Sequence, residues 1–277
     1  MSRRSPVSAL LLSSHPAPAA AVSVVALTLA IAVGLEPWRV LVVTLAFVLN
    51  QLSIGWSNDW VDVDRDRLAG RTDKPVARGD VSVRTVRTGA FLAAGASILL
   101  AFLLGPPAGL AHAVFVVSAW AYNLGLKATP LSVLPYLVSF GLLPAVVTLA
   151  AAPPRGAAWW ALLGGALLGV AAHFTNVLPD LEDDRRTGIR GLPHRMGLRA
   201  AGTVAFAALL VGAAVAAAAV GSVGAVVGAA VVLVLAIVGI RRVLARRITR
   251  VLFGLVLLAA LVLVAMLATG GGMLAAG

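Results

Sequence analysis

Long apolar stretches alternate with short polar segments along the whole chain. Nine of these stretches are bounded by charged residues, proline or glycine, and their approximate limits are 17–34, 40–56, 88–105, 108–125, 130–151, 157–178, 200–220, 223–240 and 251–269. Because a helix needs about 20 mostly apolar residues to cross a bilayer core, each stretch is long enough to span a membrane. The pattern therefore predicts an all-α, polytopic membrane protein with nine transmembrane helices.

The composition excludes a soluble domain. Of the 277 residues, 60% are hydrophobic and 12% are charged, whereas soluble domains carry about 25% charged residues. A mean hydropathy of +0.99 also excludes a disordered chain. Cysteine is absent, which excludes disulfides and thiolate chemistry. We expect one domain over residues 1–277, with a short cytoplasmic tail at 1–16 and cytoplasmic loops at 57–87 and 179–199.

The net charge of +11 results from 22 Lys and Arg against 11 Asp and Glu. A chain this basic is often a nucleic-acid-binding protein, but the positions of the charges indicate membrane topology instead. Nine spans place 20 of the 22 basic residues on one side and leave only Arg39 and Arg155 on the other. By the positive-inside rule, the N-terminus and both loops are cytoplasmic and the C-terminus lies outside. We therefore expect membrane lipid as a partner and no nucleic acid.

The first apolar stretch follows Arg3 and Arg4, an order that also occurs in signal peptides. Pro16 and Pro18 interrupt the start of this stretch, and its apolar run is longer than is usual for a signal peptide. These features favour a first stretch that is retained as a transmembrane helix.

Acidic residues are concentrated in two short segments. Ten of the eleven lie in the two long loops, and eight of these directly follow an apolar stretch. At an offset of 118 residues, 58–70 and 176–188 share the pattern N-x-x-x-D-x-[DE]-x-D-R-x-x-G. The segments follow the second and the sixth stretch. Two four-helix repeats followed by a ninth helix would therefore place both segments on one membrane face.

Helical geometry places the acidic side chains of each segment on one face. At about 100° per residue, Asn58, Asp62 and Asp66 lie together with Asp59 beside them, whereas Asp64 points away. The second segment repeats this spacing with Asn176, Asp180 and Asp184, although Pro179 disturbs its backbone.

Carboxylates gathered in this way repel one another unless cations join them. Hard oxygen ligands suit Mg²⁺, which also prefers phosphate co-ligands, so a diphosphate held by Mg²⁺ between the two segments is the favoured interpretation. The alternative is a solvated loop whose acids pair with neighbouring arginines. The duplicated spacing favours the metal site over this alternative.

Basic residues follow both segments and are suited to donate hydrogen bonds to phosphate oxygens. They are Arg71, Lys74 and Arg78 after the first segment, and Arg185, Arg186 and Arg190 after the second. Each arginine taken singly is also explained by the positive-inside bias. Lys127 is the only charge between the fourth and fifth stretches, where a cytoplasmic turn meets the helices.

The four histidines give weaker indications. His112 and His173 lie within apolar stretches, where an ionisable residue is a functional hypothesis, and a neutral hydrogen-bonded core histidine is an equally good interpretation. No histidine pair has the spacing of a zinc site. His15 and His194 carry no functional prediction.

These segments resemble the UbiA superfamily of intramembrane prenyltransferases over nearly the whole chain. Asn58, Asp59, Asp62 and Asp66 look like the family's N-D-x-x-D-x-x-x-D motif, and Arg71 to Ser82 is similar to its R-x-x-K/R-P-x-x-x-G-x-[VI]-S continuation. Asp180 and Asp184 look like the D-x-x-x-D motif. The sequence from Tyr122 to Pro130 is similar to the Y-N-x-x-L-K-x-T-P turn.

The resemblance implies a UbiA-like nine-helix bundle and an Mg²⁺-dependent prenyltransferase. It implies that an isoprenyl diphosphate donates its prenyl group to a lipophilic acceptor, which is aromatic, a quinone precursor or lipid-like. The implied metal ligands are Asn58, Asp59, Asp62, Asp66, Asn176, Asp180 and Asp184, whose five aspartates form the catalytic set. The implied diphosphate contacts are Arg71, Lys74, Arg78, Tyr122, Lys127 and Arg190.

The second segment departs from hydroxybenzoate-type members. Those members carry a D-x-x-Y-A-x-x-D start, whereas this chain has Asn176 and Pro179 there and has Arg190 where many members carry Lys. The Asn176–Pro179 sequence weakens the assignment of hydroxybenzoate as the acceptor, whereas Arg190 leaves open a change of acceptor or of the local turn alone.

Two other functions remain open from the residues alone. A terpene cyclase on the same scaffold would use every residue named above. A transporter or divalent-cation channel would place acids at mid-membrane or on both faces. The outer side carries only Glu36, Arg39 and Arg155, which favours an enzyme over a transport path.

Overall fold

The computed structural model describes residues 5–181, 184, 188–247, 250–269 and 274–275. Within these ranges the chain is helical apart from loops and one isolated antiparallel bridge between Ala157 and Ala275. The longer helices are α2 (Pro16–Ala32), α3 (Pro37–Val61), α6 (Val83–Leu103), α7 (Pro106–Leu124), α8 (Leu134–Leu149), α9 (Trp159–Val177), α12 (Leu198–Val220), α13 (Val223–Leu244) and α14 (Arg250–Thr269). The shorter ones are α1 (Pro6–Leu12), α4 (Val63–Leu68), α5 (Pro75–Arg78), η1 (Leu126–Ala128), η2 (Leu178–Asp180) and α11 (Leu192–Met196).

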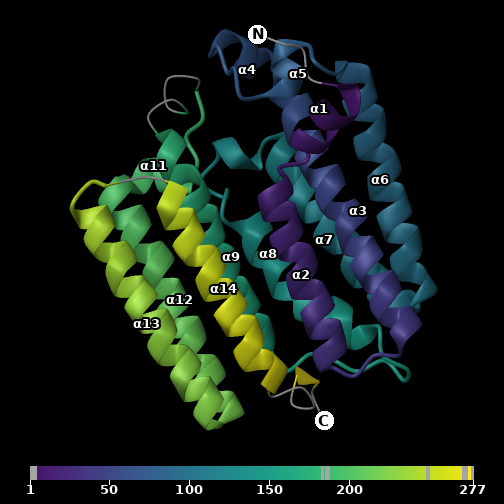
Figure 1. The fold of residues 1–277 in the computed structure, drawn as a ribbon, viewed down its shortest axis with the longest axis vertical. Coiled ribbons are helices and arrows are strands. Elements are labelled where there is room, and N and C mark those ends of the chain that lie inside the picture. Colours follow the sequence, from purple (N-terminus) through teal and green to yellow (C-terminus); the bar gives the residue numbers. More distant parts are fainter. Residues whose placement is uncertain (1–4, 182–183, 185–187, 248–249, 270–273, 276–277) are drawn as a thin grey trace.

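The long helices form one bundle in which the same neighbour order occurs twice (Figure 1). In the first half α2 packs on α3, α3 on α6 and α6 on α7, and in the second half α8 packs on α9, α9 on α12 and α12 on α13. α7 contacts α8 where the halves join, and α14 contacts both α13 and α2. This order agrees with the predicted pair of four-helix repeats followed by one helix.

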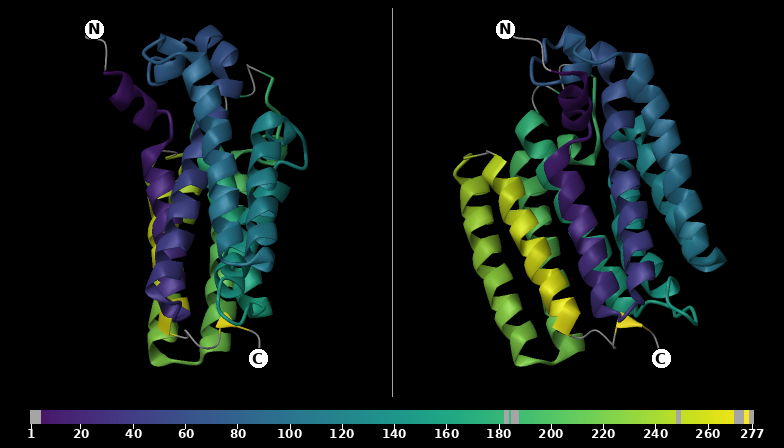
Figure 2. Two further views of the ribbon diagram at one scale, coloured as in Figure 1. Left: turned by 90° about the vertical axis from the view of Figure 1, so that its right-hand side faces the viewer. Right: turned by 45° about the vertical axis from the view of Figure 1, so that its right-hand side comes forward.

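The acidic segments lie at the same end of the bundle, with the short helices. Figures 1 and 2 show α4, α5 and α11 at the end where α1 also lies. The connections α2–α3 and α12–α13 are at the opposite end. The equivalent placement follows because each segment extends from the same end of equivalent helices, α3 and α9.

Five of the described helices are long and apolar enough to cross a membrane: α3, α6, α9 with η2, α12 and α13. α1 and α2 provide a sixth candidate if they are taken as one span with a bend of 63°. α8 is a shorter apolar helix, and so is the described part of α14 from Val251 to Met266. Each predicted stretch coincides with one long helix, so the all-helical prediction is confirmed, and the count of nine membrane spans stays a prediction.

Glycine permits close packing between α8 and α9. A Cβ atom on Gly165 would overlap the carbonyl oxygen of Phe140, and one on Gly169 would overlap that of Tyr136. Two glycines four residues apart lie on one helix face, so the backbones of α8 and α9 approach closely along it. This contact fixes the position of the helix that carries the second acidic segment.

Residues 6–12 of the predicted tail at 1–16 form a short helix, α1, and the cytoplasmic placement of the tail stays a prediction. α1 packs its buried Ala9 against Val63, Val76 and Val86 beside the first acidic segment. Pro6 lies in the first turn of this short helix, and Ser5 caps it by accepting a hydrogen bond from the Ser8 amide. Ala9 and the partly buried Leu10 therefore have partners that the linear sequence does not reveal.

The two arginines that depart from the charge separation bind helix ends. Arg39 Nη1 donates to the carbonyl oxygens of Ala150 (2.8 Å) and Leu104 (3.4 Å), which follow the last turns of α8 and α6. Arg155 Nη2 donates to the carbonyl oxygen of Val33, the C-cap of α2, at 3.4 Å. Carbonyl groups at helix C-termini lack intrahelical partners and favour a nearby positive charge.

The α8–α9 contact can be tested with two adjacent glycines. We expect Gly165→Ala to destabilise the protein by roughly 1–3 kcal/mol, because the new methyl group must displace the Phe140 backbone. A methyl group on Gly164 would meet no neighbouring helix within 4 Å. Gly164→Ala should therefore leave the thermal unfolding midpoint in detergent unchanged or slightly raised. Equal effects of the two substitutions would contradict the close approach.

Candidate active site at the polar end of the bundle

The first acidic segment is a nearly continuous helical extension of α3. α3 ends at Val61 and α4 begins at Val63, while the Asp62 amide still bonds to the Asn58 carbonyl and the Asp66 amide to the Asp62 carbonyl. The side chains therefore keep helical spacing. Asp62 and Asp66 are 7% and 5% exposed, whereas Asp64 is 88% exposed and pairs with Arg67.

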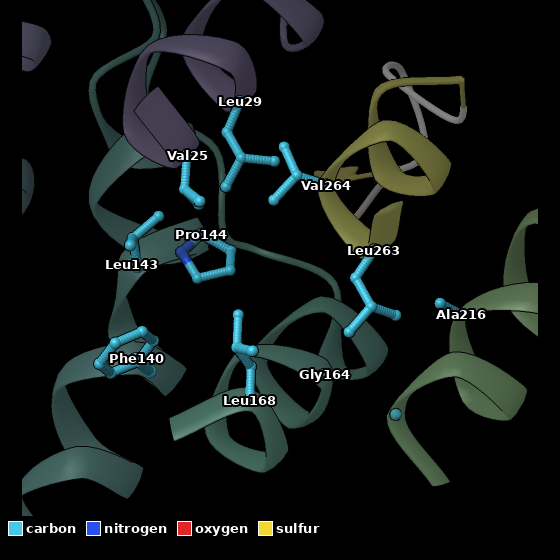
Figure 3. Close-up of a pocket in the computed structure, with 12 residues that line it drawn as sticks. Val25, Leu29, Phe140, Leu143, Pro144, Gly164, Leu168, Ala216, Leu263 and Val264 are labelled. Carbon is cyan, nitrogen blue, oxygen red and sulfur yellow. The ribbon is translucent and has the colours of Figure 1, made fainter. Parts of the chain in front are cut away.

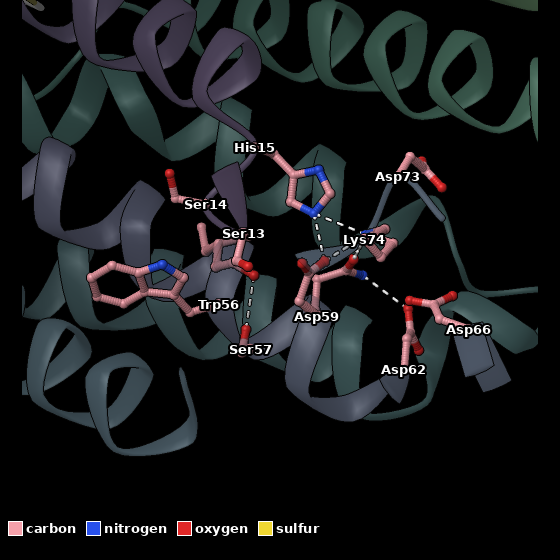
Figure 4. Close-up of polar contacts among 12 residues, drawn as sticks. Ser13, Ser14, His15, Trp56, Ser57, Asp59, Asp62, Asp66, Asp73 and Lys74 are labelled. Atoms are coloured by element: carbon pink, nitrogen blue, oxygen red, sulfur yellow. Dashed lines mark hydrogen bonds and ion pairs between the residues drawn. The ribbon is translucent and has the colours of Figure 1, made fainter. Parts of the chain in front are cut away.

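Basic side chains from two other elements and from α4 itself contact the carboxylates of this face. Lys74, at the start of α5, places Nζ 2.5 Å from Asp59 Oδ1. Lys127, in η1, donates to Asp62 Oδ1, and Arg65 donates to Asp62 Oδ2 at 2.9 Å. Figure 4 shows Asp62 and Asp66 side by side, with Asp59 next to Lys74. A buried carboxylate requires such partners, because burial without them is costly.

An amide pair attaches this cluster to α7. Asn123 Nδ2 donates to Ser57 Oγ at 2.8 Å and to the Ile54 carbonyl oxygen at 3.0 Å. Asn58 Nδ2 lies 3.2 Å from Asp62 Oδ2 and 3.4 Å from Asn123 Oδ1. The first acidic segment is therefore held against the turn that carries Lys127.

Arg71 connects the two acidic segments. Its guanidinium forms two hydrogen bonds of 2.9 Å with Asp73, and Nη1 lies 3.9 Å from Asp180 Oδ2 in the second segment. The fold thus brings together residues that are 109 positions apart in sequence.

The second segment begins with a tightened helical turn. After α9 ends at Val177, Pro179 lies in η2, and Asp180 is half-exposed. Asp184 is closer to the bundle and lies 3.2 Å from His194 Nε2 of α11. Asn176 is exposed and is hydrogen-bonded to Tyr136. Glu182, Asp183, Arg185 and Arg186 lie outside the described residues.

A buried serine joins the second loop to the bundle. Ser132 Oγ accepts a hydrogen bond from the Leu192 amide at 2.9 Å and lies 3.0 Å from His173 Nε2. His173 packs against the rings of Tyr122 and Tyr136. His173 is therefore a hydrogen-bonded core histidine, one of the two interpretations that its sequence position allowed.

Two predicted diphosphate contacts are not joined to the clusters by a described contact. Arg78 pairs with Asp80 at 3.2 Å. Arg190 is exposed, and its carbonyl oxygen accepts a hydrogen bond from Arg195. Their predicted roles stay predictions.

Sequence analysis missed two histidines that contact the acidic segments. His15 Nε2 lies 2.9 Å from Asp59 Oδ1, and His194 contacts Asp184. The sequence separation of each histidine from its aspartate is not that of neighbours on one helix face. No local sequence pattern could therefore reveal these pairs. Each depends on a short helix, α1 or α11, that folds back onto the end of the bundle.

The oxygen-rich first segment fits a hard divalent cation in its donor chemistry. Asp59 Oδ2 is buried and has no hydrogen-bond partner, although the other oxygen of the same carboxylate has two. Such an orphaned oxygen is costly, and a cation would satisfy it. Within the described part of the chain, no group of three or more acidic or histidine side chains is already arranged to hold a metal ion.

A small apolar cavity of about 30 Å³ lies deeper in the bundle, between α2, α8, α9, α12 and α14 (Figure 3). Its lining includes Leu29, Phe140, Leu168, Gly164 and Leu263 and has almost no polar surface. The volume is enough for about one water molecule. α9 forms part of the cavity lining, and Asp180 follows the C-terminal end of the same helix.

Comparison with known proteins identifies the family. The model of the UbiA prenyltransferase family matches residues 19–251. The chain belongs to this family. It is therefore a member of a family of integral membrane proteins, and the resemblance seen in the sequence is confirmed.

A curated relative of this UbiA family member is the 4-hydroxybenzoate octaprenyltransferase of Herminiimonas arsenicoxydans. The two are 29% identical over 165 residues, which cover 57% of this chain and 56% of the relative. The chain thus matches only a little over half the length of that enzyme.

Solved structures show the same fold. An apo UbiA homologue from Aeropyrum pernix K1 has a TM-score of 0.72 and 21% identity, covering 88% of this chain and 96% of its own. A homologue from Archaeoglobus fulgidus, bound to GPP and Mg²⁺, has a TM-score of 0.72 and 14% identity, covering 93% and 97%.

Two aspartates of this UbiA family member, Asp66 and Asp73, have pKa values that are shifted in opposite directions. Burial, reinforced by the nearby Asp62, raises the pKa of Asp66 above its ordinary value, and Lys74 opposes this only in part. The hydrogen bonds from Arg71 lower the pKa of Asp73 to about 2. Ionisation of Asp66 therefore destabilises the metal-free fold, whereas ionisation of Asp73 stabilises it.

We expect Asp66→Asn to raise the unfolding midpoint of the metal-free protein at pH 7. The gain should disappear as the pH falls through the raised pKa of Asp66, below which the native residue is also neutral. Asp73→Asn is the matched control and should lower the midpoint at pH 7. That loss should shrink between pH 3.8 and about 2, where the native Asp73 becomes protonated. Shifts of the same sign for both variants at pH 7 would contradict these assignments.

Proposed function

We propose that this UbiA family member is a prenyltransferase that binds an isoprenyl diphosphate between its two acidic segments and transfers the prenyl group to a lipophilic acceptor. The observation that carries the proposal is the convergence of buried Asp59, Asp62 and Asp66 with three cationic side chains at one end of the bundle. Arg71 lies between the first segment and Asp180. Metal-bridged diphosphate binding would use both acidic segments, and Arg71 is already placed between them.

The cationic residues have a second role in this proposal. Lys74 and Lys127 pair with carboxylates that would otherwise be buried and uncompensated. A divalent cation bound there would neutralise the carboxylates and would leave the ammonium groups able to donate to phosphate oxygens. The contacts of Lys74 and Lys127 with these carboxylates support this double role.

Mg²⁺, held by Asn58, Asp59, Asp62, Asp66, Asn176, Asp180 and Asp184, would stabilise the negative charge that develops on the departing diphosphate. Lys74, Lys127 and Arg71 act on the same charge from the protein side. The bond between the prenyl carbon and the diphosphate oxygen breaks and leaves an allylic carbocation. A nucleophilic carbon or oxygen of the acceptor then forms the new bond and loses a proton.

The bundle below the site supplies the dry surroundings that such a cation needs. The cavity on α9 is lined by apolar side chains and glycine, and about 12 residues at 1.5 Å each, or roughly 18 Å, separate Leu168 from Asp180 along the helix. We propose that the prenyl tail extends from the diphosphate site towards this cavity. The present volume is too small for a tail, so α2, α9 and α14 must move apart to admit one.

The acceptor class is aromatic, a quinone precursor or lipid-like. The Herminiimonas relative is named for 4-hydroxybenzoate, which favours an aromatic acceptor, whereas the Asn176–Pro179 sequence departs from the hydroxybenzoate pattern. We further propose that the polar end of the bundle faces the cytoplasm, because 20 of the 22 basic residues belong to that side in the predicted topology.

Two aspartates in the same turn provide a direct test. We expect Asp62→Asn to reduce Mg²⁺-dependent diphosphate release at least 100-fold, because it removes charge from the cluster that binds the leaving group. Asp64→Asn is the matched control, since Asp64 is 88% exposed and lies on the opposite face. The measurement uses purified protein, Mg²⁺ and a panel of labelled prenyl diphosphates, with and without acceptors.

Asp180→Asn tests the second segment in the same assay and should also abolish most of the release. If release were unaffected by both Asp62→Asn and Asp180→Asn, the proposed site would be wrong. A cyclic hydrocarbon released without acceptor would identify a cyclase in place of a transferase.

A further inference from the structure

The N-terminal segment forms part of the wall of the diphosphate site. Trp56 Nε1 of α3 donates to the Leu10 carbonyl oxygen at 2.9 Å. A Cβ atom on Gly55 would overlap the Ser14 backbone, so the chain after α1 lies directly on α3. With Ala9 also fully buried, α1 and the following residues are docked beside the first acidic segment at three points.

His15 lies where this segment turns into α2. Its backbone has φ 54° and ψ 66°, a left-handed conformation that non-glycine residues rarely adopt. Residues held in such conformations require support from their surroundings and are concentrated at functional sites. Figure 4 shows the imidazole of His15 directed at Asp59 and Lys74. The left-handed turn is thus the point at which α1 ends and the side chain reaches the acidic segment.

The two oxygens of Asp59 have different environments. Oδ1 lies 2.9 Å from His15 Nε2 and 2.5 Å from Lys74 Nζ. A carboxylate oxygen only accepts hydrogen bonds, so His15 donates to Oδ1 in the tautomer that carries the proton on Nε2. The Lys74 ammonium donates to the same oxygen and also lies 3.1 Å from His15 Nε2. Oδ2 is buried and has no partner. One oxygen is therefore fixed by two donors and the other is left open.

We propose that His15 is a positioning residue of the diphosphate site, which holds Asp59 by Oδ1 so that Oδ2 is available to a divalent cation. Groups that orient ligating carboxylates contribute to metal affinity without touching the metal. The link between His15 and catalysis rests on the proposed function. The effect of His15 on the Asp59 carboxylate is independent of the prenyl chemistry.

The second acidic segment contains a comparable contact. His194 of α11 lies 3.2 Å from Asp184 Oδ2, and its side chain is only 2% exposed. Each acidic segment is thus contacted by a histidine, His15 between α1 and α2 in one case and His194 of the short helix α11 in the other. The repetition in both halves supports an orienting role for the histidine at the first segment.

Three variants of the full-length protein in detergent separate positioning from a merely structural role. His15→Ala removes the donor to Oδ1. In His15→Gln, the amide nitrogen occupies nearly the position of Nε2 and can still donate. Trp56→Phe removes the hydrogen bond to Leu10 and loosens α1, but leaves the contact between His15 and Asp59 in place.

The first measurement is the dissociation constant of Mn²⁺ without substrate, determined by electron paramagnetic resonance. We expect His15→Ala to weaken Mn²⁺ binding about 10-fold or more. His15→Gln should restore the wild-type affinity for Mn²⁺. Trp56→Phe should lower the unfolding midpoint but retain the wild-type affinity for Mn²⁺. In the activity assay, His15→Ala should raise the Mg²⁺ concentration needed for half-maximal rate and largely preserve kcat at saturating Mg²⁺.

Wild-type affinity in His15→Ala would overturn the proposal. So would failure of His15→Gln to restore binding, or an equal loss of affinity in Trp56→Phe, because either would indicate general disturbance of the N-terminal segment. Absence of Mn²⁺ binding in the wild type would also overturn it. Mn²⁺ binding that follows the expected order without any diphosphate release would support the role of His15 while refuting the proposed function.

Discussion

Buried carboxylates at the end of an apolar bundle must be neutralised, and the rest of the site depends on this requirement. Asp59, Asp62 and Asp66 lie where few water molecules can reach them, so each needs a cation or several hydrogen-bond donors. Lys74 meets this need for Asp59 and Lys127 for Asp62, each from a different element, whereas burial raises the pKa of Asp66. The negative charge of α3 and α4 therefore attracts the basic elements around it, and the same charge suits the segment to bind a metal–diphosphate complex.

Close packing of helices makes that convergence possible. α9 carries the second acidic segment, and its glycines let it lie directly against the backbone of α8. Ser132 and His173 then join the start of α8, α9 and the loop before α11 into one polar layer beneath the acidic residues. The glycines of α9 thus help to set the position of the second acidic segment.

Sequence identity to the solved UbiA homologues is low, which is consistent with different roles for the apolar helices and for the paired polar groups. The fold is retained at 21% and 14% identity, since an apolar helix tolerates many substitutions that preserve size and hydrophobicity. Paired polar groups are less tolerant, because changing one partner leaves the other buried and unsatisfied. The curated relative matches a little over half of each chain.

The amino-acid sequence by itself determined the helical class, the two repeats and the spacing of the acidic residues. The length of an apolar stretch and the 3.6-residue period of a helix are local properties of the sequence. The first indicated the helices, and the second indicated that Asp64 lies on the face opposite Asp62 and Asp66. Only the tertiary structure decided which partners these carboxylates have. His15 reaches Asp59 across 44 residues, and Arg71 reaches Asp180 across 109, because α1, α5 and α11 fold back onto the bundle. Such contacts depend on how the elements pack in space, and no periodicity within a single segment encodes them.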